Sequence, residues 1–161
     1  MAVELTIAGT TYNYPTSGED PNWAEEATAW CIAVTQALNT LLSPGDILQT
    51  QFAVENNISV PTNVNGLIFD SGTVRAANIS YAVHRISTSN PSGNAETGTI
   101  YLIFDDSEPL NEKWKMTQIS DGVAGIAFTI GDNGQIQYQT SDIGAAGYVG
   151  TITFSAKTLS K

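Results

Sequence analysis

The sequence contains one histidine, His84, which makes it the first candidate for catalytic chemistry. A histidine can act as the base of a Ser-His-Asp triad, and serine and aspartate are plentiful in this chain. The Gly-x-Ser-x-Gly pattern of a nucleophile elbow does not occur in the sequence. His84 stands beside Arg85 in the middle of a predicted strand, so we interpret it as a structural or surface histidine.

The best carboxylate group is formed by Asp105, Asp106 and Glu108. Paired carboxylates can run acid–base or glycosidic chemistry, and three of them can hold Ca²⁺. The stretch lies between two predicted strands, which favours a solvated turn. A Ca²⁺ ion at these three residues stays open as an alternative.

Glycine-rich turns and the single cysteine complete the chemical candidates. GDNGQ lacks the further acidic ligands of a calcium loop, and its Asn-Gly step favours a tight hairpin. Residues 144–147 read GAAG and precede a predicted strand, whereas a phosphate-binding loop needs a following helix. Cys31 lies among apolar neighbours in a predicted helix, so we expect a buried small hydrophobe. One Cys and one His cannot fill a zinc site. The sequence therefore predicts no catalytic, cofactor-binding or metal-ligating residue, and no enzyme.

Sixteen acidic and six basic residues give the chain a formal net charge of −10. Contacts to phosphate need Lys or Arg, so the composition argues against nucleic acid and anionic membranes as partners. The start of the chain lacks the basic and apolar regions of a secretory signal. No run approaches the roughly 20 apolar residues that span a bilayer. We therefore expect a soluble protein made in a cytoplasm.

One helix is predicted near the N-terminus, between Asp20 as cap and Pro44 with Gly45 as terminators. Pro21 suits its first position. Its apolar stripe follows a three-and-four spacing: Trp23, Ala27, Trp30, Val34, Leu38 and Leu41. Residues 3–9 alternate as a strand, and residues 10–18 follow as an extended, then turning, segment.

After Gly45 the periodicity changes to that of strands. Strands are predicted within residues 46–61, 65–70, 74–87, 99–104, 112–120, 125–130, 135–140 and 148–159. Residues 88–98 are predicted as a polar loop, the apolar run 99–104 as a strand covered on both sides, and Gln135 as outward-facing. About eight or nine strands without helical crossovers predict an all-β, antiparallel, jelly-roll-like β-sandwich with one N-terminal amphipathic α-helix. We expect one domain over residues 1–161, comprising a strand and helix element (1–45) and a sandwich body (46–161).

The aromatic residues are the remaining candidates for binding. The faces of Trp30, Phe128, Tyr138 and Phe154 favour the core. Trp114 lies between two lysines and points to the opposite side, so core and interface remain equal alternatives for it.

Two segments resemble small virion structural proteins of tailed phages. One is YNYPTSGEDPNWAEEATAWCIAVTQAL, where a Tyr-Pro turn leads into a Trp-containing amphipathic helix. The other is GIAFTIGDNGQIQYQTSDIGAAGYVGTITFSAKTL, which is similar to the closing hairpin and strand of capsid decoration (cement) proteins and fibre heads. The resemblance implies a trimeric jelly roll on the virion, synthesised in the host bacterial cytoplasm, and it carries no catalytic residues.

From this resemblance we expect a decoration protein that binds the major capsid protein and further copies of itself on the capsid surface. Capsid contacts are expected near residues 3–14 and trimer contacts on the sheet that carries Trp114. The expected interface residues are Val3, Leu5, Ile7, Tyr12, Tyr14, Trp23 and Trp114. A tail-fibre head that recognises host glycans is the main alternative, with exposed aromatics beside Asp and Asn. A depolymerase that uses Asp105 and Asp106 is a third hypothesis, and a secreted lectin is disfavoured by the missing signal and disulfides.

Overall fold

The computed structural model describes residues 3–7, 10–14, 23–41 and 43–161, and the side chains of residues 27–37 and 43–161. The chain divides into two compact units, Met1–Ser43 and Pro44–Lys161. This division falls close to the expected boundary after residue 45. The expectation that both parts form one domain stays a prediction.

The N-terminal unit contains a hairpin and the predicted helix. Strand β1 (Val3–Ile7) pairs antiparallel with β2 (Thr10–Tyr14), and helix α1 (Trp23–Leu41) contacts both strands. The predicted helix and first strand are confirmed. Residues 10–14, expected to be extended and then turning, form a paired strand because β1 supplies the hydrogen-bonding partner. Among the described residues, no helix is both long and apolar enough to cross a bilayer.

The helix buries the predicted stripe where its side chains are described. Ala27, Trp30 and Val34 are partly buried. Trp23, Leu38 and Leu41 belong to the same predicted stripe, but their side chains lie outside the described residues, as do Asp20 and Pro21. The prediction for Cys31 is wrong: its side chain is exposed. It follows Trp30 directly, and one residue turns the helix by about 100°, which moves Cys31 off the buried stripe.

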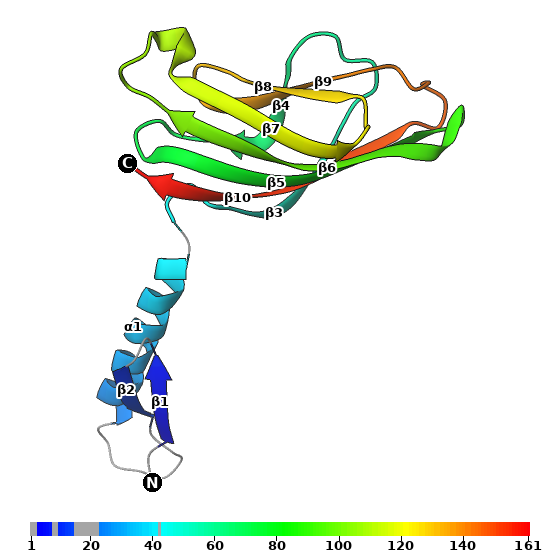
Figure 1. Ribbon diagram of the computed structural model, residues 1–161. Helices are drawn as coiled ribbons and strands as arrows, with labels where there is room; N and C mark the ends of the chain where they lie inside the picture. Colours follow the sequence, from blue (N-terminus) through cyan, green and yellow to red (C-terminus); the bar gives the residue numbers. More distant parts are fainter. Residues whose placement is uncertain (1–2, 8–9, 15–22, 42) are drawn as a thin grey trace. The chain divides into compact units, whose positions relative to one another are not determined.

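The second unit is a sandwich of two antiparallel sheets (Figure 1). The larger sheet has the order β3-β10-β5-β6-β7: β3 (Ile47–Ala53), β10 (Val149–Ser160), β5 (Val74–Ser87), β6 (Asn90–Phe104) and β7 (Trp114–Gly122). The smaller sheet has the order β4-β9-β8: β4 (Thr62–Ile68), β9 (Gln135–Thr140) and β8 (Ile126–Ile130). A short 3-10 turn (Leu110–Glu112) precedes β7. The predicted all-β sandwich is confirmed.

The strand order explains why the two sheets stay together. Strands β5, β6 and β7 follow one another as hairpins, and β10 returns to lie beside β5, which is the spatial order of a Greek key. Between β7 and β10 the chain crosses to the smaller sheet for β8 and β9. Each sheet therefore contains strands from both ends of the unit.

Apolar side chains from both sheets fill the interior. Two aromatic pairs connect the sheets edge to face: Phe52 with Tyr138 and Tyr81 with Phe128, with ring centroids 5.8 Å and 5.0 Å apart. The core positions predicted for Phe128, Tyr138 and Phe154 are confirmed.

Three local predictions in the sandwich are wrong. Residues 90–98 are not a loop but the first part of β6, because they pair with the long strand β5, and only Thr88 and Ser89 form the turn. In the run 99–104, Tyr101 and Ile103 are 46% and 50% exposed, since a single layer covers only the inner side of the sheet. Gln135 is buried, and its amide lies within hydrogen-bond distance of the Val64 carbonyl at 2.9 Å and the Leu67 carbonyl at 3.1 Å.

The predicted hairpin at GDNG is confirmed between β8 and β9. Gly134 has a φ of +80°, and a Cβ there would collide with the Phe69 carbonyl oxygen. We expect Gly134→Ala to lower the free energy of unfolding by about 2 kcal/mol or more, measured by urea denaturation. Gly131→Ala is the matched control, because its φ is ordinary and its nearest neighbour is the flexible Asn133 side chain. Equal effects of the two substitutions would contradict this account of the turn.

Candidate functional site

The structure separates the residues that could have formed a catalytic centre. His84 lies on the outward side of β5, where its cross-strand neighbours are Ala95 and Thr151. Neither neighbour is an acid that could orient the imidazole ring. The geometry therefore fits the surface histidine that the sequence predicted.

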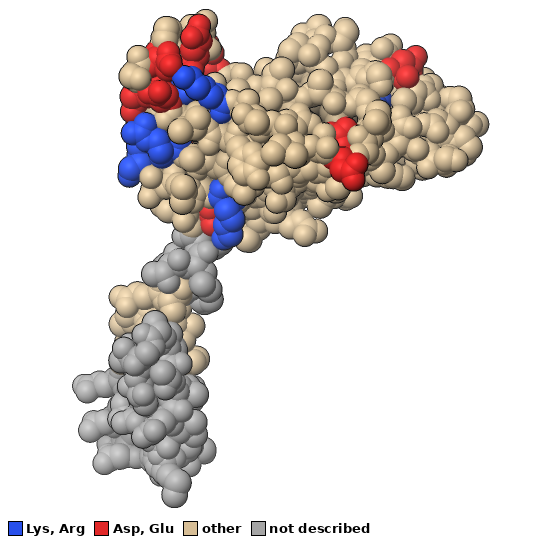
Figure 2. Space-filling model, in the orientation of Figure 1, with Lys and Arg blue, Asp and Glu red and all other residues tan. Residues whose placement is uncertain are grey.

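The three carboxylates near residue 106 have separate partners. Asp105 accepts hydrogen bonds from the Ser107 hydroxyl at 2.6 Å and backbone N–H at 3.0 Å, and these bonds lower its pKa. Asp106 pairs with Lys161 at 2.8 Å, and Glu108 with Lys115 at 2.5 Å. Acidic and basic side chains gather at this corner of the molecule (Figure 2). In the described part of the chain, no three acidic, His or Cys side chains are grouped as they would be to hold a metal ion.

A fully buried arginine organises one end of the sandwich. Arg85 has 0% exposure, and its guanidinium donates only to neutral acceptors. We call this set the arginine node: the Tyr148 hydroxyl (3.1 Å from Nε), the carbonyls of Ala124 (2.7 Å) and Gly125 (2.9 Å), the Ser141 carbonyl (2.6 Å) and Asn56 Oδ1 (2.9 Å). The node joins β5 to the β3–β4, β7–β8 and β9–β10 loops.

Asn56 extends the node to the surface. Its Oδ1 also accepts from the Ile143 N–H at 3.1 Å, and its Nδ2 donates to Asp142 at 2.7 Å. The pKa of Asp142 is lowered, first by the Gly144 N–H and then by the Asn56 amide. A shallow hollow beside the node is lined by Glu55, Asn56 and Tyr148. These loops are therefore held in one arrangement by many hydrogen bonds, as loops that present a binding surface need to be.

A second polar cluster lies under the larger sheet. The Tyr81 hydroxyl donates to Glu96 at 2.7 Å and accepts from Gln118 at 2.6 Å. The Ala124 N–H donates to the other Glu96 oxygen at 3.2 Å. Burial, and then the Glu96 carboxylate, raise the pKa of Tyr81 to about 12. The inward Glu96 is thus satisfied without a cation.

The outer face of the larger sheet is broad and carries few charges. Its outward residues are mainly Thr, Ser, Ala and Asn. Three neighbouring side chains on β6 and β7 form an apolar patch: Tyr101, Ile103 and Ile119, which are 46%, 50% and 62% exposed. Among the outward positions of the five described strands, the sole acid is Asp121. Such a face suits contact with another protein.

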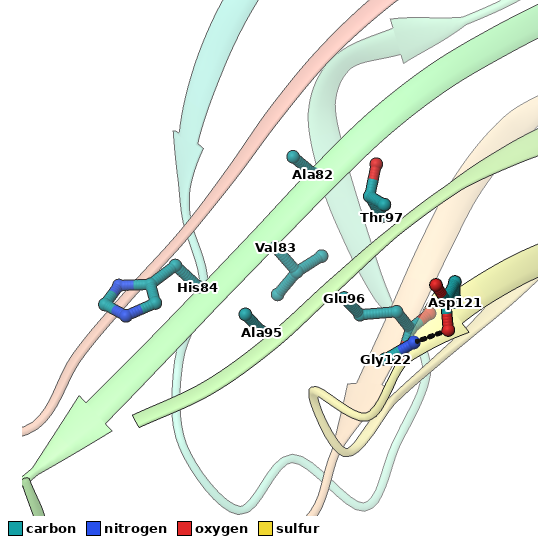
Figure 3. Close-up of a pocket in the computed structure, with 8 residues that line it drawn as sticks. All are labelled: Ala82, Val83, His84, Ala95, Glu96, Thr97, Asp121 and Gly122. Carbon is teal, nitrogen blue, oxygen red and sulfur yellow. Dashed lines mark hydrogen bonds between the residues drawn. The ribbon is translucent and has the colours of Figure 1, made fainter. Parts of the chain in front are cut away.

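A shallow hollow lies on this outer face beside the apolar patch (Figure 3). Its outward lining consists of Ala82, His84, Ala95, Thr97, Asp121 and Gly122. The small side chains leave room in the middle, while His84 and Asp121 lie at opposite sides in Figure 3. Asp121 accepts a hydrogen bond from the Gly122 N–H at 2.9 Å. The hollow can receive a protruding side chain of another molecule.

The predicted interface residues fall into two groups. Val3, Leu5 and Ile7 belong to β1, Tyr12 and Tyr14 to β2, and Trp23 begins α1; their side chains lie outside the described residues. Trp114 is 7% exposed, and its ring lies 4.9 Å from that of Phe104. Of its two alternatives, the structure shows the core.

Sequence reasoning missed Arg85, although a signal was present. Ile79, Tyr81, Val83 and Arg85 occur at every second position of one strand, so the alternation that buries the first three also turns Arg85 inward.

Substitution of Arg85 measures how much the arginine node contributes to the stability of the fold. We expect Arg85→Met to lower the free energy of unfolding by about 3 kcal/mol or more, because several buried carbonyls lose their donors. Arg75→Met is the control, since Arg75 is exposed and makes one hydrogen bond, to the Phe104 carbonyl at 2.9 Å; it should cost less than about 1 kcal/mol. Denaturant unfolding at neutral pH measures both. A small effect of Arg85→Met would refute the role of the node.

The Tyr81 cluster predicts a loss of stability at alkaline pH. The folded pKa of about 12 lies above the ordinary value of 10.0, so the folded state holds the proton more tightly. The stabilisation is complete below pH 10 and is lost as the pH rises from 10 through 12, by up to about 3 kcal/mol. Tyr81→Phe should lack this slope, whereas Tyr101→Phe, at an exposed position, should keep it. Parallel pH profiles for the wild type and Tyr81→Phe would contradict the assignment.

No protein-family model matches the chain, and no curated protein matches its sequence. One solved structure with a similar arrangement is the tailspike protein of Acinetobacter phage vB_ApiP_P1, at a TM-score of 0.44 and 12% identity, over 70% of this chain and 22% of that chain. Another is the tailspike protein of Acinetobacter baumannii phage AM24, at a TM-score of 0.35 and 9% identity, over 72% of this chain and 26% of that chain. The chain spans about a quarter of the length of these proteins. Likeness of this degree carries no argument about function.

Proposed function

We propose that this protein is a non-enzymatic structural component of a phage virion, which assembles through the outer face of its larger sheet. The observation that carries the proposal is the apolar patch on this face, where Asp121 is the one outward acid of the five strands. The placement in a virion is supported by the resemblance of residues 12–38 and 125–159 to small tailed-phage structural proteins.

The apolar patch supplies a hydrophobic contribution to binding at this face. Burial of Tyr101, Ile103 and Ile119 against a partner lowers the free energy by about 25 cal/mol per Å² of apolar surface removed from water. The surrounding Thr, Ser and Ala side chains are short, so little side-chain entropy is lost when a partner covers them. A contact of this kind is modest in one copy and becomes strong when virion symmetry repeats it.

The charge distribution supports assembly over chemistry. The sandwich unit contains eleven acids and all six bases of the chain, and the N-terminal unit contains the other five acids. The acids lie mainly away from the outer face. Asp105 and Asp106, on which a hydrolase would depend, are held by Ser107 and Lys161 instead of facing a common substrate.

Capsid decoration is the finer form of this proposal. The N-terminal unit would attach to the major capsid protein, while the sandwich contacts neighbouring copies and stabilises the shell. The trimer implied by the sequence resemblance stays a prediction.

A tail-fibre head is the second candidate, and the arginine node favours it. The node holds the loops around Glu55, Asn56 and Tyr148 rigid, and pre-organised loops of this kind can recognise a receptor. Labelled antibody on purified particles separates the two candidates, because decoration places the protein on the head and the fibre role on the tail. Binding on a glycan array would favour the fibre role.

Particles that lack the protein provide the functional test. We expect added protein to bind them and to raise the temperature of heat-driven DNA release. The variant Tyr101→Asp with Ile119→Asp should bind less than about a tenth as well, because two acids replace the apolar patch through which neighbouring copies hold one another on the particle. Val60→Asp is the control: Val60 is more exposed than either residue, at 69%, and lies outside the larger sheet. Unchanged release temperatures, or equal binding of both variants, would refute the proposal.

A further inference from the structure

Two rows of side chains cross the outer face at opposite ends of the apolar patch. Each row runs over β10, β5, β6 and β7, and cross-strand pairing places its four members side by side. The large row consists of Leu159, Ala76, Ile103 and Lys115. The small row consists of Thr153, Ala82, Thr97 and Asp121. Along every strand the two rows are six residues apart, about 20 Å.

The two rows are complementary in size and charge. On β10, the large row has the exposed Leu159 and the small row has the shorter Thr153. On β6, the large row has the exposed Ile103 and the small row has the shorter Thr97. On β7, the base Lys115 corresponds to the acid Asp121. The small row also lines the hollow in Figure 3, through Ala82, Thr97 and Asp121.

We propose that the outer face binds a second copy of this chain, sheet against sheet, about a two-fold axis perpendicular to the strands. Such an axis reverses the strand direction and keeps each strand above its own counterpart. The large row of one copy then lies over the small row of the other. Ile103 enters the partner's hollow above Thr97, and Lys115 meets Asp121 twice.

The two outward residues that lie between the rows on β6, and the two on β7, obey the same operation. Tyr101 pairs with Thr117, and Thr99 pairs with Ile119. The two-fold axis places Tyr101 over Thr99 and Ile119 over Thr117, so a large side chain again meets a small one. A face that is complementary to itself at each of these positions identifies a second copy as its occupant.

The charges on the outer face allow two acidic copies of the chain to pair there. The chain carries a net charge of −10, so two copies repel over most of their surface. At the two ends of β7 the repulsion is replaced by attraction between Lys115 and Asp121, while the outward Lys157 on β10 is paired with Asp46 of its own chain at 2.8 Å. Lys115 is bridged to Glu108 at 2.5 Å but remains half exposed, and Asp121 uses one oxygen for the Gly122 N–H, which leaves its other oxygen for the partner.

Charge exchange between the rows tests this proposal on the full-length chain. We expect sedimentation velocity to show a dimer for the wild type, in place of the trimer that the sequence resemblance implies. Lys115→Asp alone and Asp121→Lys alone should each raise the dimer dissociation constant about tenfold or more, because like charges then face each other at both symmetry-related contacts. The double variant, Lys115→Asp with Asp121→Lys, should restore the dimer.

Asp132→Lys is the control for Asp121→Lys, since it makes the same charge change at an exposed turn of the smaller sheet and should leave the dimer intact. A monomeric or trimeric wild type, or a double variant no better than the single ones, would overturn the proposal. The inference rests on the proposed role of the outer face, yet the two can fail separately. A monomer that still binds particles overturns only the two-fold pairing, and a dimer that does not bind them overturns only the virion role.

Discussion

The buried guanidinium of Arg85 is the constraint on which the sandwich end depends. A charge without exposure is tolerable only when all of its N–H groups have acceptors. Those acceptors come from three loops that are far apart in the sequence, so the loops must converge before the arginine can be buried. Because β5 lies in the middle of the larger sheet and the β9–β10 loop leaves the smaller one, the node also fixes how the sheets meet at this end.

Strand alternation connects this interior to the outer surface. The phase that turns Arg85, Tyr81 and Ile79 inward necessarily turns Ala76, Asn78, Ser80, Ala82 and His84 outward. The same phase on β6 turns Glu96 inward beside Tyr81 and exposes Tyr101 and Ile103. The inward Arg85 and Glu96 find their hydrogen-bond partners within the chain, so Tyr101 and Ile103 on the other side of the sheet are not needed to satisfy them and can be selected for contact with another molecule.

Most elements could be predicted from the sequence because their signals are local. The helix followed its apolar spacing, and the β8–β9 hairpin followed its Asn-Gly step. The first part of β6 could not be predicted, since residues 90–98 have the composition of a loop and become a strand only through pairing with β5. Gln135 was missed for a related reason, because its burial depends on distant carbonyls. The alternation of β5 indicates an inward Arg85, but it does not indicate the distant carbonyls that accept its hydrogen bonds. The outward rows also needed the register, which no periodicity supplies.

On the outer face, apolar and charged residues have different roles, because their contacts differ in strength and direction. An exposed ion pair contributes at most about 1 kcal/mol and is screened by salt, so Lys115 and Asp121 cannot supply much affinity. The apolar side chains supply the affinity, but hydrophobic contact is non-directional and would permit several orientations of two sheets. Opposite charges at the two ends of β7 favour the antiparallel orientation and penalise the parallel one, in which like charges would meet. Affinity and orientation therefore come from different residues of the same face.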